Sequence, residues 1–329
     1  MYKKKILINI PQNTVIFKIS SLNINLNDAI DRTDHIKMIV NYVFSEINDV
    51  DLDIVCLQGV NDKKLLKILI NGIYKLSRKN KKPVNIIPNV NFDYTNSVDS
   101  SIIATYSVTE ETDNILTSNV IISRYPIISS KITLFDDNQG KSIITANISI
   151  NDYIISIFNT ALTKDSLGIS NNSIRIKEID ILKKVIDDNT LEMKKINSII
   201  NKYHNKYIIK DINIIACLFN IDETRNSTVN VELIKYFKRL NGIDMFRILD
   251  DTTSENYYTT TKNVRDNYLL LVKDIVLLTS NKQIINDIFS EQNTGIIMSY
   301  VVESFDTNDN HPIESLLLLN IPDKKKEKE

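Results

Sequence analysis

The side chains that most often carry chemistry are few and widely separated in this sequence. Its 329 residues include three histidines, His35, His204 and His311, and two cysteines, Cys56 and Cys217. Histidines so far apart do not have the spacing of a zinc site, and two cysteines are too few for a disulfide framework. The six glycines are also dispersed, which excludes a P-loop and a G-x-G-x-x-G turn. We expect His35 and His204 to be solvated and both cysteines to be buried reduced thiols.

A series of short segments, most of them at the ends of strand-like apolar runs, contains the other candidates for a functional site. In chain order these segments are SLNIN (21–25), DIVCLQGV (53–60), SNVIISRYPI (118–127), FNTALT (158–163), IIACLFNID (214–222), GIDMF (242–246), LVKDIVLLTS (271–280) and NDNHPI (308–313).

The order and spacing of these segments resemble the DNase-I-like endonuclease/exonuclease/phosphatase superfamily. That superfamily includes nucleases, inositol phosphatases, neutral sphingomyelinases and deadenylases. The resemblance covers roughly residues 15–320, and Arg175, on the helix after NTAL, lies near an expected family position. It implies phosphoester hydrolysis in which Mg²⁺ neutralises charge on the phosphoryl oxygens. An Asp or His of such a site activates water, and histidines and asparagines hold the developing charge.

The resemblance also implies that four side chains needed for this chemistry are replaced. The metal-binding Glu of the family's LQE motif corresponds to Gly59, and the His of its NTH motif corresponds to Ala161. The Asp of its GDFN motif corresponds to Leu218, and the His of its SDH motif corresponds to Asn310. Because the loss of one catalytic group typically lowers a rate by several orders of magnitude, this pattern predicts a non-catalytic relative. We expect no cofactor, with the ancestral Mg²⁺ site lost, and a role as a binding or structural module.

Five polar residues remain in the cleft that the resemblance implies. Asn23, Asn220 and Asp309 match family residues, and Asp274 matches a position that supports the site. His311 follows the family His position by one residue, and such a shift at a strand end points a side chain to the opposite face. Asparagines also cap strand ends and turns without any ligand. Two alternatives therefore remain open: a divergent metal-dependent phosphodiesterase, phosphatase or nuclease using Asp309 and His311, and an unrelated α/β protein.

Strand-like and helix-like patterns alternate along the chain. Apolar residues at helical spacing predict helices at 36–47, 65–73, 172–188 and 229–240. The polar stretch 189–206 is expected to continue the third of them as helix or loop. Apolar runs predict strands at 15–22, 53–57, 207–217, 270–279, 297–304 and 314–320, and a hairpin that turns at Asn151-Asp152.

These elements predict an α/β fold with four layers, in which two mixed β-sheets pack face to face and helices cover the outer faces. We expect a single domain over residues 1–322, because no linker rich in Pro, Gly or Ser divides the chain. The charged residues 323–329 are expected to form a disordered tail.

The net charge of the chain is −1, with 40 Lys and Arg against 41 Asp and Glu. Binding to nucleic acid or to an anionic membrane usually requires an excess of basic residues, so neither is expected. The apolar runs are too short for a signal peptide core or a membrane span. We expect an intracellular, cytoplasmic protein whose partner is another protein. The excess of Asn, Ile and Lys indicates an AT-rich coding genome, such as that of a large DNA virus.

Overall fold

The computed structural model describes most of the elements that the sequence predicts. The described residues are 14–24, 32–44, 46–47, 50–59, 63–82, 84–88, 119–135, 141–151, 153–165, 170–203, 208–220, 226–245, 267–272, 294–301 and 313–320.

Two six-stranded sheets form the centre of the molecule. The first has the strand order β13-β14-β1-β4-β6-β5 and the second has the order β11-β12-β10-β9-β8-β7. The strands of the first sheet are β1 (Thr14–Asn23), β4 (Ile54–Gln58), β5 (Asn85–Pro88), β6 (Val120–Ser123), β13 (Thr294–Val301) and β14 (Ile313–Asn320). Those of the second are β7 (Ile127–Leu134), β8 (Ser142–Ile150), β9 (Tyr153–Ala161), β10 (Ile208–Leu218), β11 (Gly242–Asp244) and β12 (Asn267–Val272).

Both sheets are mixed. In the first, β1 is parallel to β4 and antiparallel to β14. In the second, β9 is parallel to β10, and the other neighbouring strands are antiparallel. A separate pair of short strands, β2 (Glu46–Ile47) and β3 (Val50–Asp51), lies before β4 in the chain.

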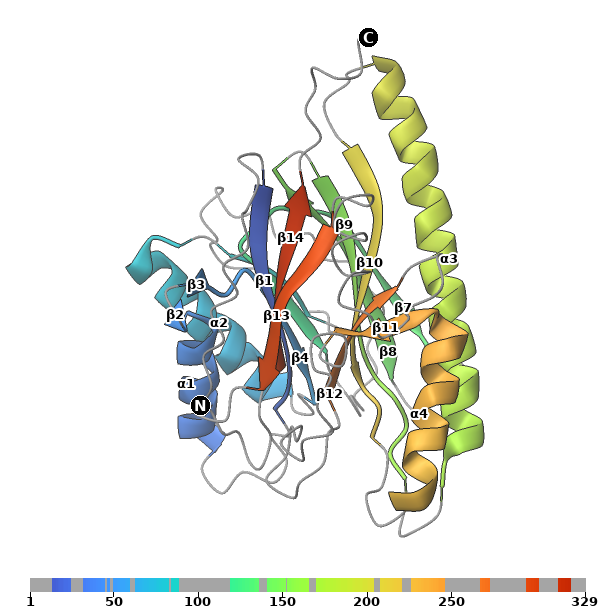
Figure 1. Cartoon of the computed structure of the whole chain (residues 1–329). Coiled ribbons are helices and arrows are strands. Elements are labelled where there is room, and N and C mark those ends of the chain that lie inside the picture. Colours follow the sequence, from blue (N-terminus) through green and yellow to red (C-terminus); the bar gives the residue numbers. More distant parts are fainter. Residues whose placement is uncertain are drawn as a thin grey trace.

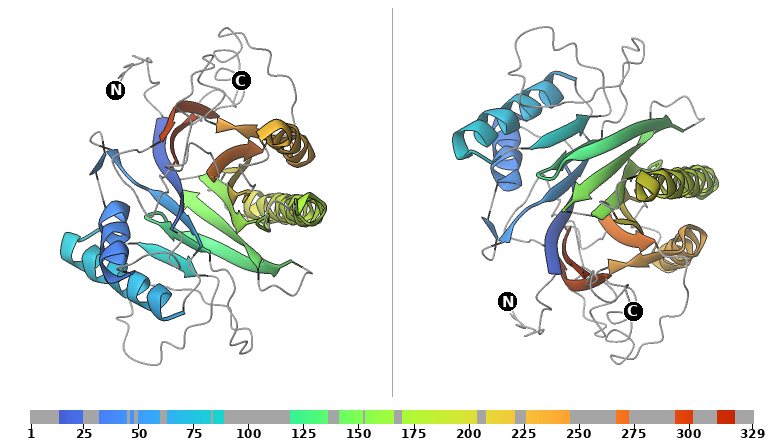
Figure 2. Two further views of the ribbon diagram at one scale, coloured as in Figure 1. Left: turned by 90° about the horizontal axis from the view of Figure 1, so that it is seen from below. Right: turned by 90° about the horizontal axis from the view of Figure 1, so that it is seen from above.

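Apolar side chains fill the space between the sheets because they alternate along the strands. In β4, Ile54 and Cys56 point into this space, whereas Val55 and Leu57 point to the opposite side. Helices α1 (Arg32–Val43) and α2 (Lys63–Asn80) pack on that side. Helices α3 (Asn172–Tyr203) and α4 (Asn226–Leu240) cover the outer face of the second sheet. Figures 1 and 2 show the four layers of helix, sheet, sheet and helix, which confirms the predicted fold class.

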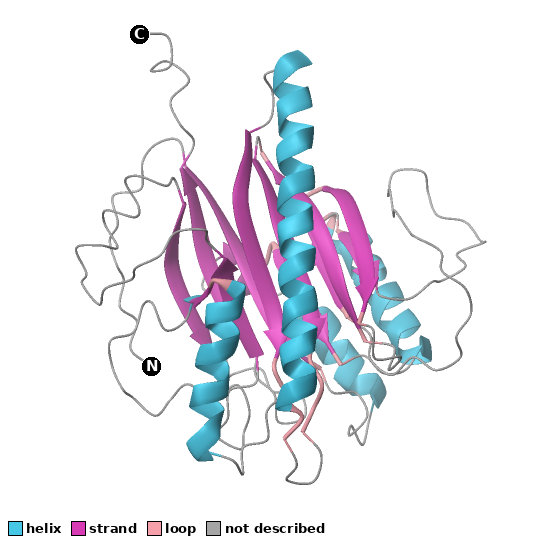
Figure 3. Cartoon of the chain, turned by 90° about the vertical axis from the view of Figure 1, so that its right-hand side faces the viewer, coloured by secondary structure: helices cyan, strands magenta, loops and turns pink. Residues whose placement is uncertain are grey.

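The boundaries of several elements differ from the prediction. The first helix ends at Val43 rather than near residue 47, because Phe44 closes a tight last turn through a backbone hydrogen bond to Asn41. Of the two alternatives for the stretch after residue 188, the structure has helix: α3 continues to Tyr203 and extends past the neighbouring strands (Figures 1 and 3). Buried Met193 keeps this continuation against the protein. The strand predicted at 270–279 is described only as β12, which begins earlier, at Asn267.

Other sequence predictions are confirmed. Ile150 pairs with Tyr153 across the predicted hairpin turn, and Asn151 has a φ of 54°, which asparagine tolerates better than most residues. Cys56 and Cys217 are free and buried. Burial raises the pKa of the Cys56 thiol, and burial together with the nearby charge of Glu178 raises that of Cys217. Both therefore remain neutral thiols at physiological pH.

None of the described helices combines the length and hydropathy that crossing a bilayer requires. The proposed tail at 323–329 lies outside the described residues. The single-domain organisation stays a prediction.

Candidate functional site at the strand ends

The carboxyl ends of four strands from both sheets meet at one end of the molecule. In the first sheet, Asn23 at the end of β1 pairs with Gln58 at the end of β4. In the second, Ala161 at the end of β9 pairs with Leu218 at the end of β10. A hydrogen bond of 2.8 Å from Gln58 Nε2 to Asn159 Oδ1 joins the two pairs across the sheets. The parallel pairing thus brings together segments that are far apart in sequence.

A buried pair of amide side chains, Gln58 and Asn159, holds the two sheets together at this end. Both side chains are fully buried. Asn159 Nδ2 donates to the backbone oxygens of Leu57 at 3.0 Å and Val120 at 2.9 Å, and Gln58 Nε2 also lies 3.1 Å from Ser21 Oγ. Asn159 of β9 therefore forms three hydrogen bonds to two strands of the opposite sheet, β4 and β6, which makes it a structural centre of the site.

The described positions where family catalytic residues are expected carry no titratable side chain. Ala161 and Leu218 are both 3% exposed, and Gly59 follows directly after Gln58. Within the described residues, no three His, Cys, Asp or Glu side chains gather in a way that could hold a metal ion. The four strand ends at Asn23, Gln58, Ala161 and Leu218 thus offer amide groups and apolar side chains, which do not fit a Mg²⁺ ion that needs carboxylate oxygens. Amides donate hydrogen bonds but do not transfer protons at neutral pH.

Gly59 has a backbone conformation that opposes any side chain, including the family's Glu. Its φ is 79°, in the left-handed region that L residues rarely adopt. We expect Gly59→Ala to lower the free energy of unfolding by about 1–2 kcal/mol, as measured by chemical denaturation. Gly59→Asn is the matched variant, because asparagine tolerates positive φ better than alanine. A larger loss in Gly59→Asn than in Gly59→Ala would show that bulk rather than backbone strain limits this position.

The two described asparagines among the candidates differ in their surroundings. Asn220 has a φ of 55°, and its Nδ2 donates to the backbone oxygen of Leu162 at 2.7 Å. Its own backbone oxygen accepts a hydrogen bond from Asp165 N at 3.2 Å. Asn220 therefore joins the end of β10 to the loop that follows β9, a structural role that needs no ligand. Asn23 is half-buried beside Gln58.

Asp274, Asp309, Asn310 and His311 lie outside the described residues. For the last three, the flanking strands are informative: Val301 pairs with Ile313, and Ile313 pairs with Ser21 near the end of β1. Of the described residues, Val301 at the end of β13 and Ile313 at the start of β14 thus lie near the site end of the first sheet.

β12 begins at the site end, whereas Asp274, which the sequence suggested there, lies outside the described residues. Its first residue, Asn267, pairs with Leu218 at the site end, whereas its last, Val272, pairs with Asn213 further from that end. Asn267 is therefore the β12 residue beside the site, and the sequence analysis missed it. The signal in the sequence for an earlier strand start was the apolar run that begins at Tyr268, three residues before the segment 271–280.

His35 was also misjudged, because it is buried rather than solvated. Its side chain is 7% exposed, and Nε2 lies 3.2 Å from the backbone oxygen of Ile24. Ile24 in turn donates its N–H to Gln58 O at 2.9 Å. The imidazole thus packs against the chain one residue beyond Asn23. Its neighbours Ile36 and Ile39 are both buried, and this apolar surrounding was the available signal. His204 lies outside the described residues.

A buried ionic cluster anchors the loop that follows β9. The guanidinium of Arg175 is fully buried and bonds Asp165, the Thr163 backbone oxygen at 3.0 Å, Glu232 at 3.1 Å and Tyr236 at 3.0 Å. Burial alone lowers the pKa of Arg175, but the hydrogen bonds to Asp165 and Tyr236 outweigh it and raise the pKa above its ordinary value. Burial also raises the pKa of Tyr236 to about 12, partly offset by Arg175. Arg175 therefore ties α3 to α4 and to the loop beside the site.

A second set of polar contacts holds the same loop from the other side. Glu178 accepts hydrogen bonds from the backbone N–H of Thr163 at 2.8 Å and from the Thr163 hydroxyl. Lys141 bonds the same hydroxyl and lies 3.7 Å from Glu178. Residues 162–165 are thus held from both sides by buried polar groups, so the loop is a rigid border of the site.

Comparison with known proteins gives a fold rather than a close relative. No known protein-family profile and no curated protein matches the sequence. Among solved structures, an endonuclease/exonuclease/phosphatase family protein from Leptotrichia buccalis C-1013-b is 12% identical, with a TM-score of 0.51, covering 91% of this chain and 98% of its own.

Two further solved structures are similar to this chain over nearly its whole length. TDP2 from D. rerio, solved with a single-strand DNA product, is 11% identical, with a TM-score of 0.54, covering 92% of this chain and 98% of its own. A mutant of beta toxin from Staphylococcus aureus with bound magnesium ions is 13% identical, with a TM-score of 0.53, covering 92% of this chain and 99% of its own. With the sheet order and strand-end site described above, these matches show that the chain has the DNase-I-like fold of the endonuclease/exonuclease/phosphatase superfamily.

Proposed function

We propose that this chain is a non-catalytic relative of the Mg²⁺-dependent phosphoesterases and acts as a binding or structural module for a protein partner. The observation that supports the proposal is the chemistry of the strand ends. Gly59, Ala161 and Leu218 stand where the superfamily's metal ligand, histidine and aspartate are expected. The buried amides Gln58 and Asn159 between them are used to join the sheets.

The turn residues point the same way. Asn220, retained from the family pattern, donates its amide to the backbone oxygen of Leu162 and so joins the end of β10 to the loop after β9. The left-handed backbone at Gly59 is a conformation that a Glu would strain. Position 59 therefore lacks a carboxylate and has a backbone conformation that does not favour one.

The net charge of the chain favours a protein over a nucleic acid as the partner. The chain has a net charge of −1, and nucleic acid binding draws its affinity from an excess of basic residues. The DNA product and the magnesium ions belong to the TDP2 and beta toxin structures. Whether this chain has lost both is what the experiments must decide.

The metal prediction is that the melting temperature does not change with Mg²⁺ or Mn²⁺ up to millimolar concentration. A ligand that binds the native state must raise the melting temperature by mass action, so an unchanged value reports the loss of the site. Thermal unfolding followed by far-UV circular dichroism measures it, with Ca²⁺ and EDTA as controls for nonspecific effects.

The matching activity assay uses a chromogenic phosphodiester with each metal. We expect no turnover above the buffer rate. The competing function, a divergent phosphoesterase using Asp309 and His311, makes the opposite prediction. Turnover that survives repurification and is abolished by Asp309→Ala, together with a saturable metal shift lost in the same variant, would establish that alternative.

A further inference from the structure

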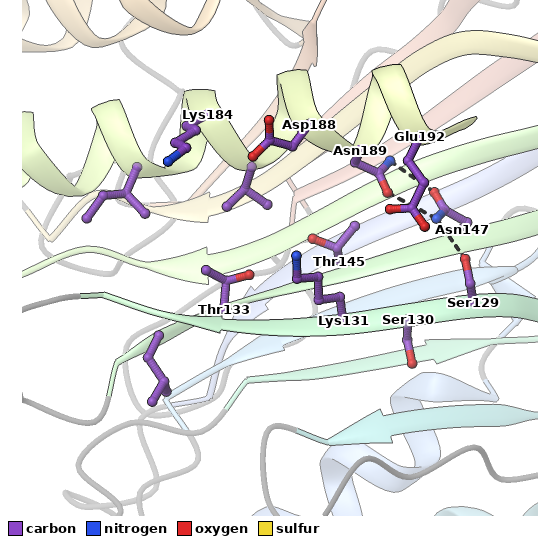
Figure 4. Close-up of a pocket in the computed structure, with 13 residues that line it drawn as sticks. Ser129, Ser130, Lys131, Thr133, Thr145, Asn147, Lys184, Asp188, Asn189 and Glu192 are labelled. Atoms are coloured by element: carbon purple, nitrogen blue, oxygen red, sulfur yellow. Dashed lines mark hydrogen bonds between the residues drawn. The ribbon is translucent and has the colours of Figure 1, made fainter. Parts of the chain in front are cut away.

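A groove lies on the outer face of the second sheet, against α3. It runs between β7 and β8 on one side and the middle of α3 on the other, with a volume of about 430 Å³. This volume is within the range of about 300–1,000 Å³ of small-molecule pockets. Figure 4 shows side chains from both strands and from α3 converging on it.

The groove is polar where a helix packed on a sheet is normally apolar. Along β8, Ile144, Ala146 and Ile148 point into the core between the sheets. The alternate residues face α3. Of these, Ile143 packs in the apolar cluster between the second sheet and α3, whereas Thr145 and Asn147 line the groove. Polar groups at such an interface cost free energy unless they find partners, so their arrangement calls for a physical explanation.

Part of this polar surface is satisfied within the protein. Asn147 Nδ2 donates to Ser129 Oγ at 2.8 Å and to Asn189 Oδ1 at 3.1 Å. Asn189 Nδ2 lies 2.9 Å from Ser156 Oγ, and Ser156 donates to Asn147 Oδ1 at 2.6 Å. This network attaches α3 to β7, β8 and β9 and forms one rigid end of the groove (Figure 4).

The hydroxyls in the middle of the groove have no such partners. Thr145 is 2% exposed, and its Oγ1 forms no hydrogen bond within the described part of the chain. Thr133 on the neighbouring strand β7 is half-buried, and its Oγ1 also forms no hydrogen bond within the described part of the chain. Buried polar atoms are nearly always paired in folded proteins, so the two unpaired hydroxyls lining this groove are available to a bound molecule.

Four charged side chains surround these hydroxyls. Lys131 comes from β7, and Lys184, Asp188 and Glu192 come from α3 (Figure 4). All four are exposed, and none forms an ion pair with another described residue. A simple anion in the groove would face both carboxylates, and a simple cation would face both lysines. A molecule carrying both signs satisfies all four.

We propose that this groove binds a small zwitterionic molecule of about the size of a dipeptide. Its anionic group pairs with Lys131 and Lys184, its ammonium group pairs with Asp188 and Glu192, and polar atoms between them bond Thr145 and Thr133. The groove lies on the outer face of the second sheet, whereas the inner face of that sheet packs against the first sheet. The inference therefore stands whether or not the strand ends catalyse a reaction.

The test compares ligands that differ only in their charges. A panel of dipeptides with free termini is screened against the full chain by saturation-transfer NMR and calorimetry, beside the same dipeptides acetylated at the amine and amidated at the carboxyl. Members of the free panel are expected to bind saturably, and their capped forms at least about tenfold more weakly, because each charge-assisted hydrogen bond contributes about that factor. No saturable binding by any free dipeptide, or equal binding of the capped forms, overturns the proposal.

Variants then locate the binding. Lys131→Met and Glu192→Gln are expected to weaken binding at least about tenfold, whereas Lys177→Met, on the same helix but outside the groove, leaves it unchanged. Thr145→Val removes the unpaired hydroxyl at nearly constant shape. This variant should keep or raise the melting temperature of the free protein and lower its affinity for the ligand. The two measurements together separate a loss of binding from a loss of folding. Binding unaffected by all three groove variants places the ligand elsewhere and overturns the proposal.

Discussion

Replacing Arg175 by methionine is expected to lower the free energy of unfolding by about 3–5 kcal/mol, the cost of breaking a buried ion pair. The guanidinium is fully buried and contacts Asp165 and Glu232, whose side chains are 0% and 7% exposed. Methionine fills much of the same space but leaves both carboxylates buried without their cation. Guanidinium denaturation followed by far-UV circular dichroism measures the loss, since the chain has no tryptophan.

The matched control is Arg239→Met, which removes an arginine from an exposed ion pair. Arg239 bonds Asp180 across α4 and α3, with side chains 44% and 55% exposed. Solvent-exposed pairs contribute about 0–1 kcal/mol, so this variant should unfold close to the parent protein. Equal losses in the two variants would mean that the Arg175 cluster does not anchor the loop after β9 as the contacts indicate.

Exchanging one atom in the centre of the strand-end site is expected to have a similarly large effect. Asn159→Asp replaces the Nδ2 that donates to the backbone oxygens of Leu57 and Val120 by an oxygen. At neutral pH a buried carboxylate then faces two carbonyl oxygens, with no opposite charge to pair it. We expect a loss of about 3–5 kcal/mol at pH 7, because an uncompensated charge is left in the interior.

The loss should depend on pH with a definite sign. Burial and the two carbonyls raise the folded-state pKa of the introduced carboxyl above its ordinary value of about 3.9. The folded variant then binds a proton more readily than the unfolded chain does. Its stability relative to the parent therefore recovers as pH falls through the folded pKa towards the unfolded one, and is lost again as pH rises. Unfolding curves at a series of pH values between neutral and mildly acidic conditions measure this slope.

Asn151→Asp provides the control for the same exchange at the surface. Asn151 is exposed in the turn between β8 and β9, and aspartate also tolerates its positive φ. This variant should change stability little and without the acid recovery. A loss in Asn159→Asp that is small, or that grows on acidification, would show that Asn159 is not the buried donor between the sheets.

Much of the fold follows from local pattern. The alternation in β8 and β9, the Asn151-Asp152 turn and the amphipathic helices predict elements that the structure contains, because side-chain period is set by backbone geometry alone. The order of the strand-end segments was enough to indicate two packed sheets. Element ends were less accurate, as at Val43, because the backbone hydrogen bond from Phe44 to Asn41 that closes the last turn is not encoded in the apolar spacing.

By itself, the sequence determined which chemical groups are present at the strand ends: glycine, alanine and leucine at positions 59, 161 and 218, with asparagines retained nearby. Only the tertiary structure decided what the polar residues do, because their partners lie far away in the chain. Gln58 meets Asn159 across 101 residues, Arg175 meets Glu232 across 57, and Asn147 meets Asn189 across 42. It also showed that His35 is buried and that Asn267 adjoins the site. No local period records these contacts, since hydrogen bonds and ion pairs between distant segments exist only once the sheets and helices have packed.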